Sequence, residues 1–222
     1  MWYNITNKRG EEVSKSVYSV ILDDGLVAEL DRAAYKNGVS RSTMLDKILS
    51  DYLTVETPVV RMENIFSKME GLIDEWAGLR FVNQAHLAMA SVQSALSYRY
   101  NPTVKYAIEL YQSGEDLGEI KISLRTQNPT LIALMEDFYG FFAYLENKYL
   151  GKREYNYENF KFTRYLKNPK LSSEETGEAI AYFVRSTNYI LNSYFDGIGN
   201  IERAKSDIEK DYALNIAKNI QV

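Results

Sequence analysis

The sequence contains no cysteine and one histidine among its 222 residues. Without thiols there is no disulfide, no thiolate metal site and no cysteine nucleophile. The lone histidine, His86, stands among Ala, Leu and Met in a stretch that we expect to be helical, with no second histidine to share a metal. No glycine-rich phosphate loop, nucleophile elbow or paired-histidine motif is present. We therefore expect no enzyme, no metal and no other cofactor, although carboxylates from distant segments could still meet in space.

Long apolar runs are also lacking. No stretch approaches the roughly twenty apolar residues that are needed to cross a bilayer. Residues 1–16 hold no apolar run of the kind found in a secretory signal. These two observations predict a soluble, cytoplasmic protein that has no membrane partner.

Basic residues are not in excess. The chain holds 26 Lys and Arg against 30 Asp and Glu, for a formal net charge of −4. Within residues 1–57 the balance is seven basic to nine acidic side chains. Nucleic-acid affinity comes largely from phosphate neutralisation, so this balance argues against non-specific coating of nucleic acid. A local basic patch can still bind DNA.

A strand followed by a helix is predicted at the start of residues 17–53. Residues 17–22 alternate between two sets of side chains, the period-two pattern of a strand with two faces. Asp23-Asp24-Gly25 ends this strand and offers a carboxylate cap to the next segment. That segment is predicted to be a helix, because its small and apolar residues recur at helical spacing: Leu26, Leu30, Ala33 and Ala34.

A second amphipathic helix follows after a short turn. Asn37-Gly38 ends the first helix, since glycine accepts the left-handed backbone found at helix ends. Ser40 is the expected N-cap of the second helix, and Pro58 marks a boundary beyond its end. The apolar residues of this helix lie on one stripe: Met44, Leu45, Ile48, Leu49, Tyr52 and Leu53.

This order of elements, with Leu-Asp-Asp after the strand and Asn-Gly-Val-Ser-Arg-Ser between the helices, resembles the ribbon-helix-helix DNA-binding proteins of the Arc, MetJ and CopG group. The resemblance implies a mainly α fold. Residues 17–57 would form a β-α-α unit intertwined with a second copy, after a flexible arm at 1–16. A helical C-terminal domain, 59–222, would follow with one short strand or hairpin. A generic helical hairpin after an extended arm is the alternative.

The resemblance also implies roles for individual residues. The strand residues expected to face DNA bases are Val17, Ser19 and Ile21. The expected phosphate clamp, at the start of the second helix, is Ser40, Arg41 and Ser42, where a helix N-terminus attracts anions. The expected dimer core is Tyr18, Val20, Leu22, Leu30, Leu45, Ile48 and Leu49.

The base-facing set departs from the family pattern, which usually places Arg, Lys, Asn, Gln or Thr there. Only Ser19 can form hydrogen bonds, while Val17 and Ile21 can at best touch thymine methyl groups. Base discrimination should therefore be weak or should favour A·T steps. Lys15 can add a phosphate contact. Alternatively, this face packs on the C-terminal domain or on a protein partner.

After Pro58 the pattern is mainly helical. Apolar spacing and capping residues predict helices at 59–77, 80–98, 102–112, 131–150, from 172 to 196, and 199–219. The one clear strand signal is EIKISLRT at 119–126, and a loop is expected at 152–170. The strand at 119–126 begins like a second, degenerate ribbon, but an ordinary hairpin or edge strand packed on helices fits better.

Residues 152–170 interleave six Lys or Arg with five aromatic residues. Such a mixture can bind single-stranded nucleic acid by stacking. Aromatic residues usually pack first, so a loop that plugs the core is the favoured interpretation. Its expected accessory DNA contacts are Lys152, Arg153, Lys161 and Arg164.

The sequence thus predicts a dimeric, cytoplasmic regulator of transcription, of the kind that includes small repressors. Its partners would be double-stranded DNA and a second copy of itself. One alternative is a non-enzymatic scaffold that uses the ribbon only to dimerise. Another is a plasmid or virus DNA-maintenance factor. The C-terminal domain would serve further oligomerisation, contact a protein partner or sense a small effector.

Overall fold

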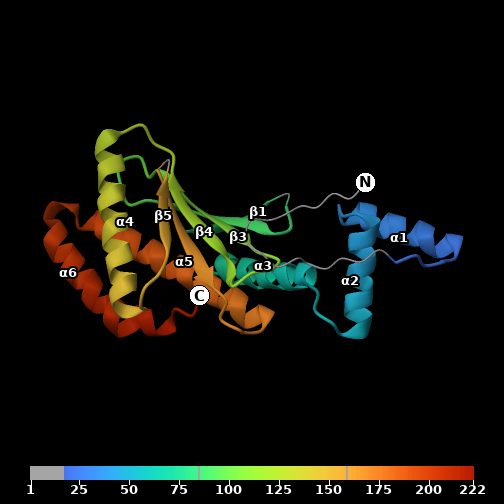
Figure 1. Ribbon diagram of the computed structural model, residues 1–222. Helices are drawn as coiled ribbons and strands as arrows, with labels where there is room; N and C mark the ends of the chain where they lie inside the picture. The colour runs from blue at the N-terminus through green and yellow to red at the C-terminus, as the bar shows by residue number, and fades with distance from the viewer. Residues whose placement is uncertain (1–17, 85, 159) are drawn as a thin grey trace.

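A six-stranded antiparallel sheet forms the centre of the protein in the computed structural model, which describes residues 18–84, 86–158 and 160–222 (Figure 1). The strands lie in the order β1-β2-β3-β4-β6-β5. Their bounds are β1 Leu79–Asn83, β2 Met89–Ala95, β3 Thr103–Leu110, β4 Asp116–Leu124, β5 Tyr155–Glu158 and β6 Lys161–Lys167.

Six α-helices accompany the sheet in the described residues. They are α1 Asp24–Lys36, α2 Arg41–Leu53, α3 Pro58–Asp74, α4 Pro129–Tyr149, α5 Ser173–Asp196 and α6 Ile201–Asp211. Three short turns complete the C-terminal part: the 3₁₀ turns η1 Ile198–Asn200 and η3 Ala217–Asn219, and the π turn η2 Tyr212–Ile216. Figure 1 shows α1 and α2 set apart at one end of the molecule, while α3 lies beside the sheet.

One face of the sheet is packed against helices. In β3 the side chains of Tyr106 and Ile108 are fully buried, whereas Lys105 is partly exposed. Tyr106 lies opposite Ile122 of β4, which keeps the buried side chains of neighbouring strands on the same face. These side chains join α3, α4 and α5 in one hydrophobic core. Among the described residues, none before Met62 belongs to this core.

The predicted mainly α fold, a β-α-α ribbon followed by a helical domain, is wrong. Residues 80–98 and 102–112, which were expected to be helical, contain most of β1 and all of β2 and β3, and the expected loop at 152–170 contains β5 and β6. The Ala and Ser residues of the stretch that forms β2 favoured the prediction of a closely packed helix. In the structure, pairing with β1 and β3 determines the conformation of this stretch. Sheet pairing outweighs local preferences of a few tenths of a kcal/mol per residue.

The predicted N-terminal strand is also absent, because residues 18–23 have no regular secondary structure. A strand needs a neighbour for its backbone hydrogen bonds, and the described part of this chain places no strand beside that segment. The predicted arm at 1–16, which includes Lys15, lies outside the described residues, as does Val17.

Other elements agree with the sequence pattern. The helix predicted at 59–77 is α3, the one at 131–150 is α4, and the strand signal at 119–126 falls in β4. The capping box is present, since the Ser172 hydroxyl accepts from the Glu175 N–H at 3.2 Å and the Glu175 carboxylate accepts from the Ser172 N–H at 3.0 Å. The Ser172 N–H, together with the Ser172 hydroxyl that donates to the same carboxylate at 2.8 Å, lowers the pKa of Glu175.

A fully buried ion pair links α4 to β6. Arg164 donates from Nη2 to Glu146 Oε1 at 2.9 Å, and neither side chain is exposed. The Tyr155 hydroxyl donates to the other carboxylate oxygen at 3.1 Å. The Arg164 guanidinium lies 4.5 Å from the centre of the Phe183 ring of α5. The pair therefore joins four elements inside the core, and Arg164 cannot be the DNA contact that the sequence suggested.

Replacing one partner of this pair should be far more damaging than replacing both. Glu146→Leu leaves the Arg164 charge buried without compensation, so we expect the free energy of unfolding in urea to fall by about 3–5 kcal/mol. Glu146→Leu with Arg164→Met should recover most of that loss. The exposed Glu154→Leu serves as the control and should change little. A double variant no more stable than the single one would contradict the importance of the pair.

Candidate functional site

The hairpin of α1 and α2 is fixed by local caps that the sequence predicted. The Asp23 carboxylate accepts from the Gly25 N–H at 2.8 Å, and the Ser40 hydroxyl accepts from the Thr43 N–H at 3.2 Å. Between the helices Gly38 has φ +64°, a conformation that glycine adopts without strain. Each helix therefore begins at a cap residue whose side chain accepts from a backbone N–H two or three residues further along the chain.

Apolar side chains cover this hairpin and the preceding segment, yet a single chain leaves most of them exposed. Val20 is 66% exposed and Ile21 is fully exposed. Of the seven predicted dimer-core residues, Leu30 is buried and Leu45 is partly buried. The other five are exposed: Tyr18, Val20, Leu22, Ile48 and Leu49. A concentration of exposed apolar side chains within one short segment is typical of an interaction site.

The residues of the predicted phosphate clamp lie together at the start of α2. The hydroxyls of Ser40 and Ser42 are 3.2 Å apart, and both side chains are exposed. Arg41 forms a two-pronged ion pair with Asp31 of α1, at 2.5 and 2.6 Å. This pairing lowers the pKa of Asp31 and raises that of Arg41. The clamp therefore presents a helix N-terminus and a cation that is already shared with a carboxylate.

Sequence reasoning missed Asp31. It stands ten residues before Arg41, on the other helix of the hairpin, so no spacing rule for a single helix connects the two. The available signal was the opposite charge of two residues that flank the Asn37-Gly38 turn. Ser19, the one hydrogen-bonding residue among the expected base contacts, is exposed in the segment before α1.

The accessory contacts predicted at 152–170 differ in accessibility. Lys152 and Lys161 are exposed, and Arg153 is partly buried. Arg164 is fully buried, as described above. Of the aromatic residues, Phe162 is in the core and Tyr155 packs against it, whereas Tyr157 and Phe160 are exposed, so only part of this stretch fits the packing interpretation.

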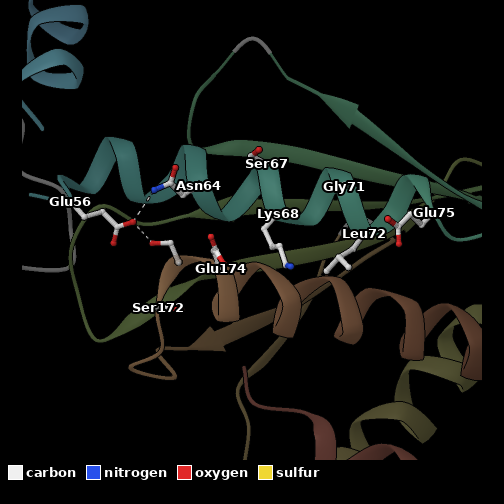
Figure 2. A pocket seen from close by; sticks show the side chains of 10 residues that line it. Glu56, Asn64, Ser67, Lys68, Gly71, Leu72, Glu75, Ser172 and Glu174 are labelled. Atoms are coloured by element: carbon white, nitrogen blue, oxygen red, sulfur yellow. Dashed lines mark hydrogen bonds between the residues drawn. The ribbon is translucent and has the colours of Figure 1, made fainter. Parts of the chain in front are cut away.

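A groove of about 770 Å³ lies between α3 and the start of α5 (Figure 2). It is lined by three carboxylates, Glu56, Glu75 and Glu174, and by Lys68. The Glu56 carboxylate accepts hydrogen bonds from Asn64 of α3, at 3.0 Å, and from the Ser173 hydroxyl of α5. Glu56 belongs to the linker after α2, so these bonds attach the linker to both helices.

Within the described ranges, no group of three or more His, Cys, Asp or Glu residues is arranged to hold a metal ion. The helix that was expected around His86 is absent. It lies between β1 and β2, where its Nδ1 accepts from the Ala88 N–H at 3.2 Å. Within the same ranges no helix has the length and apolar character that a membrane crossing requires.

Comparisons with family models, curated proteins and solved structures found no match to this chain. The resemblance of residues 17–53 to ribbon-helix-helix proteins therefore stays a prediction from the sequence.

Proposed function

We propose that the protein is a DNA-binding regulator that acts as a homodimer through residues 18–53. The exposed apolar side chains of this segment, in the same hairpin as the clamp at the start of α2, are the observation that supports the proposal. Five predicted dimer-core side chains are in contact with water in a single chain. A second copy would cover them with the same face, as in other two-fold dimers, and would place two α2 N-termini on one assembly.

The clamp residues would fix the DNA backbone. The N-terminus of α2 offers unpaired N–H groups and the positive end of the helix dipole to a phosphate. The exposed hydroxyls of Ser40 and Ser42 add donors. Arg41 would contact the phosphate in competition with Asp31, because the same guanidinium now binds that carboxylate. Phosphate contacts of this kind set position rather than sequence preference.

Sequence preference would come from the exposed segment before α1, which has no regular secondary structure in a single chain. Ser19 can donate to or accept from a base edge, and the exposed Ile21 can touch a thymine methyl group. Two such contacts per chain support weak or A·T-favouring discrimination.

The body of the protein, residues 58–222, would serve assembly or control. It has a core of its own, so it can carry a further subunit contact, a protein partner or an effector site. Contacts between neighbouring dimers on adjacent half-sites would strengthen DNA binding through effective concentration. A regulator acts where its DNA is, and we place this one in the cytoplasm.

A scaffold that dimerises without binding DNA is the second candidate. The excess of acidic over basic residues in 1–57 and the apolar character of Ile21 favour it. A plasmid or virus DNA-maintenance factor would use the DNA contacts proposed above for another purpose. Titration of labelled random-sequence duplex DNA at low salt separates DNA binding from the scaffold role. No binding at micromolar protein would favour the scaffold.

Arg41→Ala should weaken binding to every DNA sequence by a similar factor. Loss of one phosphate contact in each of the two chains should also reduce the slope of log affinity against log salt concentration by about 1.8, at about 0.9 per contact. Fluorescence anisotropy across a salt series measures both effects. Arg32→Ala is the matched control, because Arg32 also pairs with a carboxylate, Glu29, on the exposed side of α1. An unchanged slope in Arg41→Ala would remove this residue from the clamp.

Asp31→Asn should act in the opposite direction. It frees the Arg41 guanidinium and removes a negative charge beside the expected phosphate, so binding should tighten roughly two- to fivefold at low salt. The same anisotropy titration measures the change, and Glu29→Gln is its charge-matched control. Binding that tightens equally in both variants would show only a general effect of net charge.

A further inference from the structure

The face of the sheet that lies away from the helices, termed the open face, is polar at one end. On the packed face, a row of paired residues crosses five strands and is buried: Phe81, Val92, Tyr106, Ile122 and Phe162. Side chains alternate between the two faces of a strand, so the next row of paired residues points the other way.

This next row, termed the basic row, carries three cations. It consists of Arg80, Gln93, Lys105, Ser123 and Lys161, paired in that order across β1, β2, β3, β4 and β6. Arg80 and Lys161 are exposed, and Lys105 is partly exposed. Neighbouring strands lie about 4.8 Å apart, so the Cα atoms of successive cations are roughly 10 Å apart. Glu158 of β5, opposite Lys161, adds one carboxylate at the end of the row.

Within the part of the chain that the structure describes, the cations of the basic row form no ion pair, whereas other cations on the open face do. Further along β4 and β6, Lys121 pairs with Glu119, and Lys167 pairs with Asp116 at 3.0 Å. Those charges are compensated by their neighbours. The basic row therefore leaves positive charge available to an anionic ligand.

Two exposed aromatic rings lie at the same end of the sheet. Tyr100, in the turn between β2 and β3, is fully exposed, and Phe160, in the turn between β5 and β6, is 56% exposed. Both have a left-handed backbone, with φ of +65° and +59°, which is uncommon for a large side chain. Neither ring gains full burial in return. Strained residues of this kind cluster at positions that bind ligands.

Two more cations lie beside these turns. Arg99 immediately precedes Tyr100, and Arg125 directly follows β4, whose end is paired with the start of β3. Both arginines are exposed. This end of the sheet thus interleaves exposed rings with exposed cations, although the chain as a whole is acidic.

Rings and cations in this arrangement suit a nucleic acid strand whose bases are unpaired. Cations along a surface follow the phosphates, while exposed rings stack on the bases. In a duplex, pairing and stacking keep the bases from such rings. Proteins distinguish RNA through its 2′-hydroxyl, but of the two uncharged residues in the basic row, Gln93 already accepts from Arg80 at 2.7 Å. Little in the row selects a ribose, so DNA is the expected strand.

We propose that this end of the sheet binds single-stranded DNA, with bases stacked on Tyr100 and Phe160 and phosphates held by the basic row. The site lies wholly within the body, residues 58–222. It shares no residue with the hairpin that is proposed to contact duplex DNA, so either proposal can fail without the other.

Fluorescence anisotropy of the full chain with a labelled oligothymidylate of about ten nucleotides measures this binding. Tyr100→Ala removes one stacking surface, so the dissociation constant should rise about 5- to 150-fold. Tyr100→Phe keeps the ring and should bind as tightly as the wild type. Tyr189→Ala, which removes another exposed tyrosine, on α5, is the matched control and should also bind normally.

A salt series tests the phosphate contacts. Lys105→Met should reduce the slope of log affinity against log salt concentration by about 0.7, the value for one contact to a single strand. Lys167→Met removes the same charge further along the open face and should leave the slope unchanged.

Duplex DNA separates this site from the hairpin. Arg41→Ala should leave the affinity for the oligothymidylate unchanged, and Tyr100→Ala should leave the affinity for duplex DNA unchanged. The proposal is overturned if the oligothymidylate does not bind at micromolar protein, or if Tyr100→Ala and Phe160→Ala both bind it like the wild type. Tighter binding of an oligouridylate of equal length would overturn DNA as the ligand.

Discussion

Apolar side chains must leave water, and the hairpin of α1 and α2 has too few neighbours within one chain to allow this. Its two buried apolar residues, Leu30 and Ala34, lie between the helices, and neither belongs to the core of the body. Around them Val27, Val39, Met44 and Leu45 are partly buried, and the other large apolar side chains of 18–53 stay exposed. Burial of apolar surface contributes about 25 cal/mol per Å², so this face favours association with a matching surface.

The body differs because its apolar side chains are buried in a core of its own. Its sheet has one face packed under α3, α4 and α5, and the ion pair of Glu146 and Arg164 ties α4 to β6 inside that core. The linker after α2 is attached to the body by the hydrogen bonds of Glu56 to Asn64 and Ser173. The protein thus combines a hairpin whose apolar side chains are largely exposed with a body that has a core of its own. That combination suits the proposed DNA-binding dimer with an attached assembly or control module.

Features that depend on neighbouring residues could be predicted from the sequence. The caps at Asp23, Ser40 and Ser172 each act within three residues, and long apolar stripes indicated α3 and α4. The strands β1, β2 and β3 could not be predicted, because their conformation depends on pairing between distant segments, such as Tyr106 with Ile122. Arg164 was taken for a surface cation for the same reason, since its partner Glu146 comes from another element. The Arg41 and Asp31 pair likewise forms only across the folded hairpin.

The central claim is that residues 18–53 associate with a second copy. Sedimentation equilibrium of the full chain measures this directly over a range of protein concentrations. We expect a mass twice the 25.6 kDa of one chain, with dissociation only on dilution. A mass of 25.6 kDa that persists well above micromolar concentration would contradict it.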